Sequence, residues 1–148
     1  MIPLRPSLGF PPGASRARVQ RADGMVPWAP GLHADPWNHV EAAMALTVGG
    51  FLDEAVAAYR WLAGVQHDDG SWCTYYLPSA VGGIEDGRRD TNVCAYVATG
   101  ALHHLRSTGD RAIAQELWPM VERAVDFVVG HQRPEGALTW SVQPDGSS

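Results

Sequence analysis

The sequence contains no lysine, and all eleven of its basic residues are arginine. The 148-residue chain carries a net charge of −5. Nucleic-acid binding needs clustered basic side chains on one surface, and the only cluster here is Arg16, Arg18 and Arg21. We therefore expect no nucleic-acid partner.

Cysteine and long apolar runs are also scarce. Two cysteines, Cys73 and Cys94, are too few for a disulfide framework and favour a reduced, cytoplasmic compartment. No run of about 18 apolar residues is present, so no transmembrane segment is predicted. Residues 1–18 are rich in proline, glycine and arginine without any period, which predicts a disordered or non-native leader before a domain at residues 19–148.

The sequence does contain a threefold repeat of glutamine, glycine and tryptophan. The three copies read QRADGMVPW (20–28), QHDDGSW (66–72) and QRPEGALTW (132–140). In every copy the glycine stands four positions after the glutamine. The last two copies follow apolar stretches with helical spacing. A tag that recurs after helices indicates stacked helix pairs.

The segment between the first two tags predicts one helix pair. Asp35 is a favourable N-cap and Pro36 suits the first helical position, so a helix begins there and stops at Gly49. A second helix is predicted over residues 53–66, and residues 73–77 could form a short strand.

The segment between the last two tags predicts a second pair. A helix begins at Asp90 and ends before Gly109, and another runs over residues 111–131. Pro119 should kink or restart the latter helix.

The two pairs also align with each other, which predicts an all-α fold. A shift of 66 residues superposes Ala58 on Ala124, Trp61 on Phe127 and Gly64 on Gly130. We expect a partial (α/α) toroid built from repeated helical hairpins. Six such hairpins need roughly 300 residues, so we expect a fragment of a larger ring, with possible self-association through its exposed edges.

The tags resemble the QW motifs of squalene–hopene cyclases and the related terpenoid-cyclase and protein-prenyltransferase superfamily. The runs PWAPGLHADPWNHVEAAMAL, QHDDGSW and DTNVCAYVATGALHHL resemble bacterial proteins of that kind, over residues 19–146. The resemblance implies inner helices around a cavity, with each tag tying an outer helix to the next inner one. It also implies a prenyltransferase or terpenoid-cyclase-like activity on an isoprenoid or lipid.

Another segment supports different functions. TGDRAIAQELWPMVERAVDFV resembles the outer-helix region of six-hairpin, glucoamylase-like glycosidases. That resemblance implies a carbohydrate-active hydrolase with a glycan substrate. A non-catalytic helical-repeat binding module is a further alternative, so enzyme status stays open.

In such toroids the cavity opens where the inner helices begin, so we expect the site at the two predicted starts. The candidate residues are Asp35, Glu41 and Asp90 for catalysis and Trp37, Asn38, His39, Thr91 and Asn92 for substrate binding. Asp35 and Asp90 are equally typical of plain helix caps. Glycoside hydrolysis needs two carboxylates across a cavity, which Glu41 with Asp90 could provide.

The motifs of isoprenoid and zinc enzymes are missing from these residues. Asp68 and Asp69 do not form the D-x-D-D acid motif of the cyclases and suit a turn. We expect no zinc site from Asp90, Cys94 and His103 or His104, because the histidines lie more than about 10 Å from Cys94 along the same helix. We expect neither a metal nor a cofactor.

Overall fold

The computed structural model of the protein describes residues 13–78, 83–145 and 147. The helices are α1 (Ala14–Val19), α2 (Pro36–Val48), α3 (Leu52–Val65), α4 (Thr91–Thr108) and α5 (Arg111–Gly130). Short strands complete it, namely β1 (Tyr75–Tyr76), β2 (Ile84–Asp86), β3 (Arg89–Asp90) and β4 (Ser141–Val142). Most of the expected leader lies outside the described residues, although residues 14–18 belong to α1, and the domain boundary at residue 19 stays a prediction.

The four long helices confirm the helix pairs predicted from the sequence. The side chain of Asp35 caps α2 by accepting a hydrogen bond from the backbone N–H of Asn38. Gly109 ends α4 with a left-handed φ of 72°, a conformation that glycine adopts without steric cost. Asp110 then caps α5 through the backbone N–H groups of Ala112 and Ile113.

Helix α5 continues through Pro119, so the predicted restart of the helix there is wrong. Proline removes the hydrogen bond to the carbonyl four residues earlier and crowds that carbonyl. Here that carbonyl belongs to Gln115, which is exposed and can bond to water. Leu117, Met120 and Val121 are buried on both sides of the proline and keep the helix packed.

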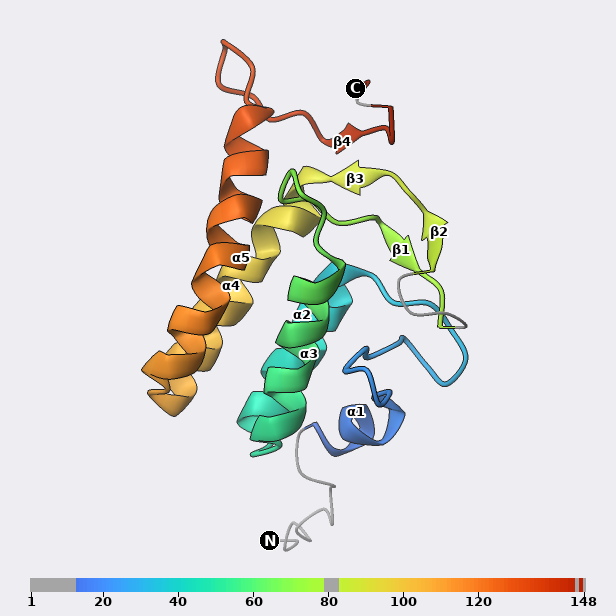
Figure 1. The fold of residues 1–148 in the computed structure, drawn as a ribbon, viewed down its shortest axis with the longest axis vertical. Coiled ribbons are helices and arrows are strands. Elements are labelled where there is room, and N and C mark those ends of the chain that lie inside the picture. Colours follow the sequence, from blue (N-terminus) through green and yellow to red (C-terminus); the bar gives the residue numbers. More distant parts are fainter. Residues whose placement is uncertain (1–12, 79–82, 146, 148) are drawn as a thin grey trace, which may run out of the picture.

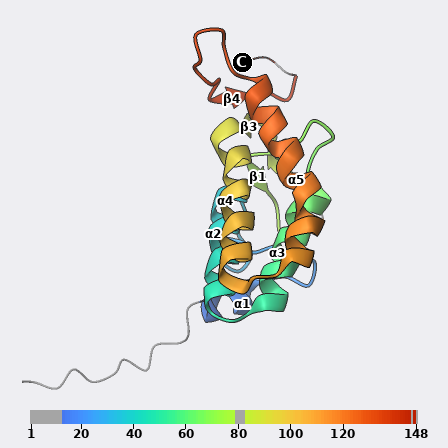
Figure 2. The same ribbon diagram turned by 90° about the vertical axis from the view of Figure 1, so that its left-hand side faces the viewer.

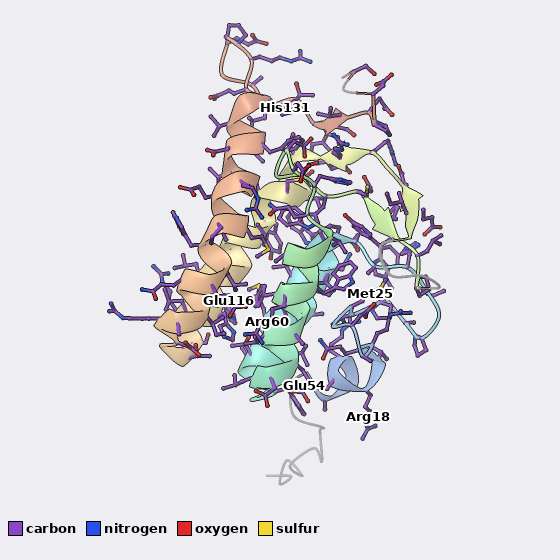
Figure 3. All side chains as sticks on the ribbon, viewed as in Figure 1. Arg18, Met25, Glu54, Arg60, Glu116 and His131 are labelled. Atoms are coloured by element: carbon purple, nitrogen blue, oxygen red, sulfur yellow. The ribbon has the colours of Figure 1, made fainter. Side chains whose placement is uncertain are left out.

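The helices form two layers (Figures 1 and 2). Helices α2 and α4 lie side by side in one layer, and α3 and α5 form the other. Arg60 of α3 and Glu116 of α5 make a two-pronged ion pair between exposed side chains of the second layer, with N–O distances of 2.7 and 2.8 Å (Figure 3).

The strands gather at the end of the bundle where α2 and α4 begin (Figure 1). β1 pairs with β2 and β3 pairs with β4, both antiparallel. An isolated bridge between Ala34 and Tyr76 ties the residue before the α2 cap to β1. The short strand predicted over residues 73–77 is confirmed, and the strands fix the loops around the helix starts.

Glutamine and glycine hold equivalent places in three turns, which we call the Gln–Gly turns 20–24, 66–70 and 132–136. In each, the glutamine Nε2 donates to the glycine carbonyl, at 3.0, 3.0 and 2.9 Å respectively. The three glycines have φ of 96°, 89° and 92°, which an L side chain rarely adopts.

The first two turns also hold a helix of the α3–α5 layer. Gln20 Nε2 donates to the carbonyl of Glu54 in α3 at 2.8 Å, and Gln66 Nε2 donates to the carbonyl of Met120 in α5 at 2.9 Å. A side chain on Gly70 would overlap with the carbonyl of Arg123. The first two turns therefore tie α3 and α5, the two helices of the second layer, whereas we expected each tie to reach an inner helix.

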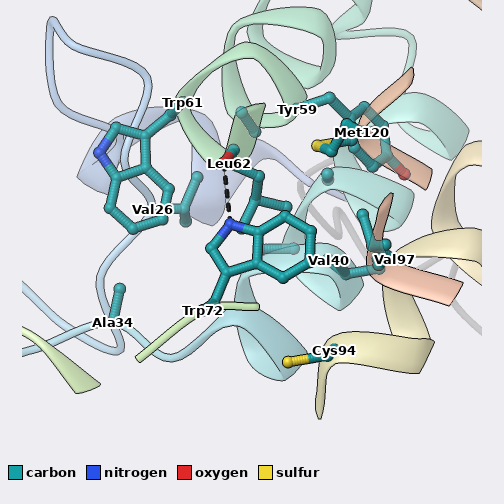
Figure 4. Packing of buried hydrophobic residues seen from close by; sticks show 14 of the residues in the cluster. Val26, Ala34, Val40, Tyr59, Trp61, Leu62, Trp72, Cys94, Val97 and Met120 are labelled. Carbon is teal, nitrogen blue, oxygen red and sulfur yellow. Dashed lines mark hydrogen bonds between the residues drawn. The ribbon is translucent and has the colours of Figure 1, made fainter. Parts of the chain in front are cut away.

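The tryptophans of the three copies do not share one role. Trp72 is fully buried and donates its indole N–H to the carbonyl of Leu62 at 2.8 Å (Figure 4). Trp28 and Trp140 are 45% and 69% exposed. Around Trp72 the core brings together residues from both layers, including Val40, Tyr59, Leu62, Val97 and Met120.

We predict that Gly70→Ala destabilises the protein much more than Gly136→Ala. Both substitutions impose the left-handed conformation on alanine, at a cost of about 1–2 kcal/mol. Only the alanine at position 70 meets a neighbouring helix, which adds about 1–3 kcal/mol of overpacking. Urea unfolding of both variants measures the difference, and equal losses would contradict the assigned role of this turn.

Candidate functional site

Asp35 is a buried structural residue at the start of α2. Its Oδ1 accepts from the backbone N–H of Asn38 at 2.9 Å, and its Oδ2 accepts from the Asn38 amide at 2.8 Å and from the Trp28 indole. Both carboxylate oxygens are therefore engaged within the protein. This geometry suits a residue that positions the helix start and Trp28, whereas the sequence suggested a catalytic role.

His39 lies in the core, although the sequence suggested substrate binding. The backbone N–H of Val26 donates to its Nδ1 at 3.1 Å, so the proton resides on Nε2, which contacts the carbonyl of Ala58 at 2.9 Å. Complete burial lowers the pKa of His39, outweighing these hydrogen bonds and the nearby acids. A neutral imidazole with both nitrogens occupied has no atom left for a substrate.

Trp37 and Glu41 lie one turn apart on an accessible face of α2 and meet Tyr96 of α4. The Trp37 and Tyr96 rings stack with centroids 3.9 Å apart and planes 4° apart. Glu41 Oε1 accepts from the Trp37 indole at 3.2 Å and from the Tyr96 hydroxyl at 3.4 Å. We call these three residues the Glu41 cluster.

The Glu41 cluster combines an exposed carboxylate with a flat aromatic pair. Partial burial, the Glu41 charge and the hydrogen bond to Glu41 together raise the pKa of the Tyr96 hydroxyl, which therefore remains a donor at neutral pH. An aromatic surface beside a few well-placed polar groups is typical of small-ligand sites.

The first turns of α4 extend this polar surface. Asn92, Tyr96 and Thr99 follow helical spacing and share one face of the helix. The Oδ1 atoms of Asp90 and Asn92 are buried without a hydrogen-bond partner among the described residues. Buried polar groups normally find a partner, so these two oxygens are exceptions to that rule.

Thr91 is placed differently from the substrate-binding role expected for it. Its hydroxyl donates to the carbonyl of Thr139 at 2.7 Å, and its backbone N–H donates to the carbonyl of Trp140 at 3.0 Å. Thr91 is buried and anchors the segment that leads to β4.

Asn38 lies apart from the Glu41 cluster and lines a cavity near the start of α2. That cavity has a volume of about 290 Å³ and is lined by Arg16, Val26, Pro27, Trp28 and Asn38. Trp28 also packs edge-on against His33, whose ring stacks on Tyr75. The sequence-predicted residues thus divide between this cavity, the Glu41 cluster and the protein interior.

Metal binding finds no support among the described residues, where no three histidine, cysteine or acidic side chains group together as ligands. Cys94 is buried and free, and burial raises the pKa of its thiol to about 12. A protonated thiol is a poor metal ligand.

Sequence reasoning did not single out Tyr96 as a site residue. The apolar residues of α4 drew attention to its packing face, and Tyr96 lies off that face. Its position four residues after Asn92 could have indicated that the two share a surface. The partner that makes Tyr96 informative, Trp37, comes from another helix and is not visible in the spacing.

No family model matches the chain. It is similar to an MMP endo-(1,4)-3-O-methyl-alpha-D-mannosidase of Mycolicibacterium hassiacum, with 48% identity over 130 residues. The aligned stretch covers 88% of this chain and 35% of that protein. The chain thus spans about a third of the length of this curated relative.

Solved structures show the same fold at low sequence identity. A family 8 endoglucanase of Klebsiella pneumoniae matches 80% of this chain and 38% of its own, with a TM-score of 0.62 and 16% identity. A cellobiose 2-epimerase of Bacillus thermoamylovorans matches 91% of this chain and 37% of its own, with a TM-score of 0.65 and 18% identity. A family 8 endo-beta-1,4-glucanase from an Achatina fulica gut metagenomic library matches 87% of this chain and 41% of its own. Its TM-score is 0.66 and its sequence identity is 14%.

These matches correct the resemblance drawn from the sequence. The chain is mostly helical and resembles (α/α)6 toroid proteins of the six-hairpin glycosidase kind. The assignment to squalene–hopene cyclases and prenyltransferases, and the isoprenoid or lipid function that it implied, are wrong because the relative found is a mannosidase. The Gln–Gly spacing led to the wrong family because it reflects how the turns tie α3 and α5. A link of this kind is not specific to one chemistry.

Among the described residues, no helix combines the length and the apolar character that crossing a membrane requires.

We predict that the protein loses stability as the pH falls from about 8 to about 5. Burial lowers the pKa values of His39 and His104 below the unfolded value of 6.5. The unfolded chain therefore binds protons first, and the stabilisation present above 6.5 is lost as pH falls toward the folded pKa values.

Chemical unfolding across this pH range measures the effect. His39→Gln should reduce the dependence of the free energy of unfolding on pH. A free energy of unfolding that stays constant down to pH 5 would contradict the neutral, buried state assigned to these histidines.

Proposed function

We propose that this chain is part of a carbohydrate-active hydrolase that cleaves a mannose-based glycan at a site built around Glu41. The observation that carries the proposal is the 48% identity to a 3-O-methyl-alpha-D-mannosidase over 88% of this chain. The fold of carbohydrate-active enzymes agrees with it. Because the chain spans about a third of that relative, the activity of the whole protein is part of the proposal.

Glu41 is our candidate for the general acid or base. It is the exposed carboxylate of the Glu41 cluster, held by hydrogen bonds from Trp37 and Tyr96. Proton transfer by a positioned carboxylate contributes about 10²–10⁴-fold to a rate. The two hydrogen bonds fix the direction of its Oε1 and leave its other oxygen available.

The stacked rings of Trp37 and Tyr96 are our candidate sugar-binding surface. Apolar faces of sugar rings lie against aromatic side chains, while a few polar groups fix orientation. A 3-O-methyl group replaces a hydroxyl donor by an apolar group, so an aromatic surface suits such a sugar better than a polar one. Asn38 and Asn92 would contribute amide groups near the two helix starts.

Asp90 is our candidate for the second carboxylate that glycoside hydrolysis requires. It precedes Tyr96 by six residues, which corresponds to about 9 Å along a helix axis. Asp35 is proposed as a positioning residue only, because both of its oxygens are bound within the protein.

The cytoplasmic location expected from the cysteine content stays a prediction.

We predict that Glu41→Gln lowers hydrolysis of an α-1,4-linked 3-O-methylmannose oligosaccharide by about 10²-fold or more, while Glu122→Gln leaves it unchanged. Glu122 is an exposed glutamate of α5 on the other layer and serves as the matched control. Release of reducing ends measures cleavage, and calorimetry measures binding of the same oligosaccharide.

The proposal also predicts that Trp37→Ala weakens binding by roughly tenfold or more, because the sugar loses its stacking surface. Cleavage by Glu41→Gln at the rate of the unchanged protein would remove Glu41 from the mechanism. Absence of both binding and cleavage in the unchanged protein would overturn the proposed function of this chain.

A further inference from the structure

Trp28 is a partly exposed tryptophan whose orientation is fixed by the protein. Its indole N–H donates to Oδ2 of the buried Asp35, and its backbone N–H donates to the carbonyl of His33 at 2.9 Å. The Trp28 ring packs edge-on against the His33 ring, with centroids 4.5 Å apart. Even so, 45% of Trp28 is exposed. An aromatic ring that is held in place and still faces solvent is typical of a ligand-binding surface.

Two strands support the Trp28 ring through His33. The Nδ1 atom of His33 lies 2.8 Å from Oε2 of Glu85 in β2. The His33 ring also stacks on Tyr75 of β1, with centroids 4.5 Å apart and planes 28° apart. Residues from the loop before α2 and from both strands therefore hold the Trp28 ring. Supporting contacts of this kind keep a binding surface in one geometry before the ligand arrives.

Trp28 lines the cavity near the start of α2, which we call the Trp28 cavity. Its other lining residues are Arg16, Val26, Pro27 and Asn38. Val26 and Pro27 are buried, and the backbone N–H of Val26 donates to Nδ1 of the buried His39 at 3.1 Å, so this side of the cavity is fixed to the core. The volume of about 290 Å³ lies just below the range of about 300–1,000 Å³ for drug-sized ligands. The cavity therefore suits one sugar residue.

The lining of the Trp28 cavity matches the chemistry of a methylated sugar. Its valine, proline and tryptophan provide apolar surface for the ring carbons and for the methyl of a methoxy group. The Arg16 guanidinium only donates hydrogen bonds, and the ether oxygen of a methoxy group only accepts them. The Asn38 side-chain nitrogen donates to Asp35 at 2.8 Å, so its amide oxygen can accept from a sugar hydroxyl.

The Trp28 cavity adjoins the Glu41 cluster at the first turn of α2. Asn38 lines the cavity, and the preceding residue, Trp37, belongs to the cluster. Successive side chains of a helix point about 100° apart, so the two surfaces lie on neighbouring sides of the same turn. A glycan chain that crosses the start of α2 can therefore contact both surfaces.

We propose that the Trp28 cavity is a second sugar position, which binds a 3-O-methylmannose residue of the glycan chain held at the Glu41 cluster. This second position rests on the proposed function, since it requires that the Glu41 cluster binds a sugar. A chain bound at the cluster presents its next residues to the cavity at a high effective concentration, so binding at both positions is tighter than binding at one. The Trp28 cavity therefore makes the protein prefer long glycans to short ones.

Binding of a short and a long ligand to the full chain tests the second sugar position. The ligands are methyl 3-O-methyl-α-mannoside and an α-1,4-linked 3-O-methylmannose hexasaccharide. The indole N–H signal of Trp37 in NMR spectra reports binding of each ligand at the Glu41 cluster. We expect Trp28→Ala to weaken hexasaccharide binding by about tenfold or more and to leave the affinity for the single sugar unchanged. Trp28→Phe keeps an apolar ring and should cause a smaller loss.

Trp118→Ala is the matched control, because Trp118 is a 60% exposed tryptophan of α5, in the other layer. It should change neither affinity. An unchanged hexasaccharide affinity in Trp28→Ala, or an equal loss for both ligands, would overturn the second sugar position and leave the proposed function standing. If neither ligand shifts the Trp37 signal of the unchanged protein, the proposed function and the second sugar position are both overturned.

Discussion

The hydrogen bond from the Gln66 side chain to the Met120 carbonyl is the contact on which the arrangement of the two hairpins depends. The same amide closes its own turn at Gly70, and its oxygen accepts from the Arg123 guanidinium. One side chain thus ends α3, shapes the turn and fixes α5 beside α3. Gly70 sets how closely α5 approaches, since it leaves no room between the turn and the Arg123 carbonyl.

The candidate site depends on this linkage because its residues come from both hairpins. Trp37 and Glu41 belong to α2, and Tyr96 belongs to α4, so their contacts exist only when the hairpins stack in register. The α3–α5 layer carries the Gln66–Met120 link, and the α2–α4 layer carries the polar and aromatic surface. Carbohydrate-active enzymes with this fold vary in chemistry, which is consistent with a common scaffold that carries different inner surfaces.

Local signals in the sequence were sufficient to locate the four long helices, whereas the short helix α1 was not predicted. Asp35, Gly109 and Asp110 act through neighbouring residues along the chain, and they begin or end their helices as predicted. Pro119 was misleading because burial of the residues around it outweighs one missing hydrogen bond. Packing between residues far apart in the sequence therefore decided that α5 continues through Pro119.

The candidate site could be predicted only in part, for the same reason. Proximity to a helix start drew attention to both Glu41 and His39, two residues earlier, and could not tell the exposed side chain from the buried one. His39 is buried because Val26 and Ala58 reach it from other segments. The family assignment failed because the Gln–Gly spacing reflects a structural turn that links helices. Such a turn carries no information about the reaction.

The most direct test of the proposed site is an NMR titration of the protein with a 3-O-methylmannose oligosaccharide. The indole N–H signal of Trp37 should shift together with the amide signals of Glu41 and Tyr96, while the indole of the buried Trp72 should not. Shifts confined to residues away from the Glu41 cluster, or no shifts at saturating sugar, would contradict the account.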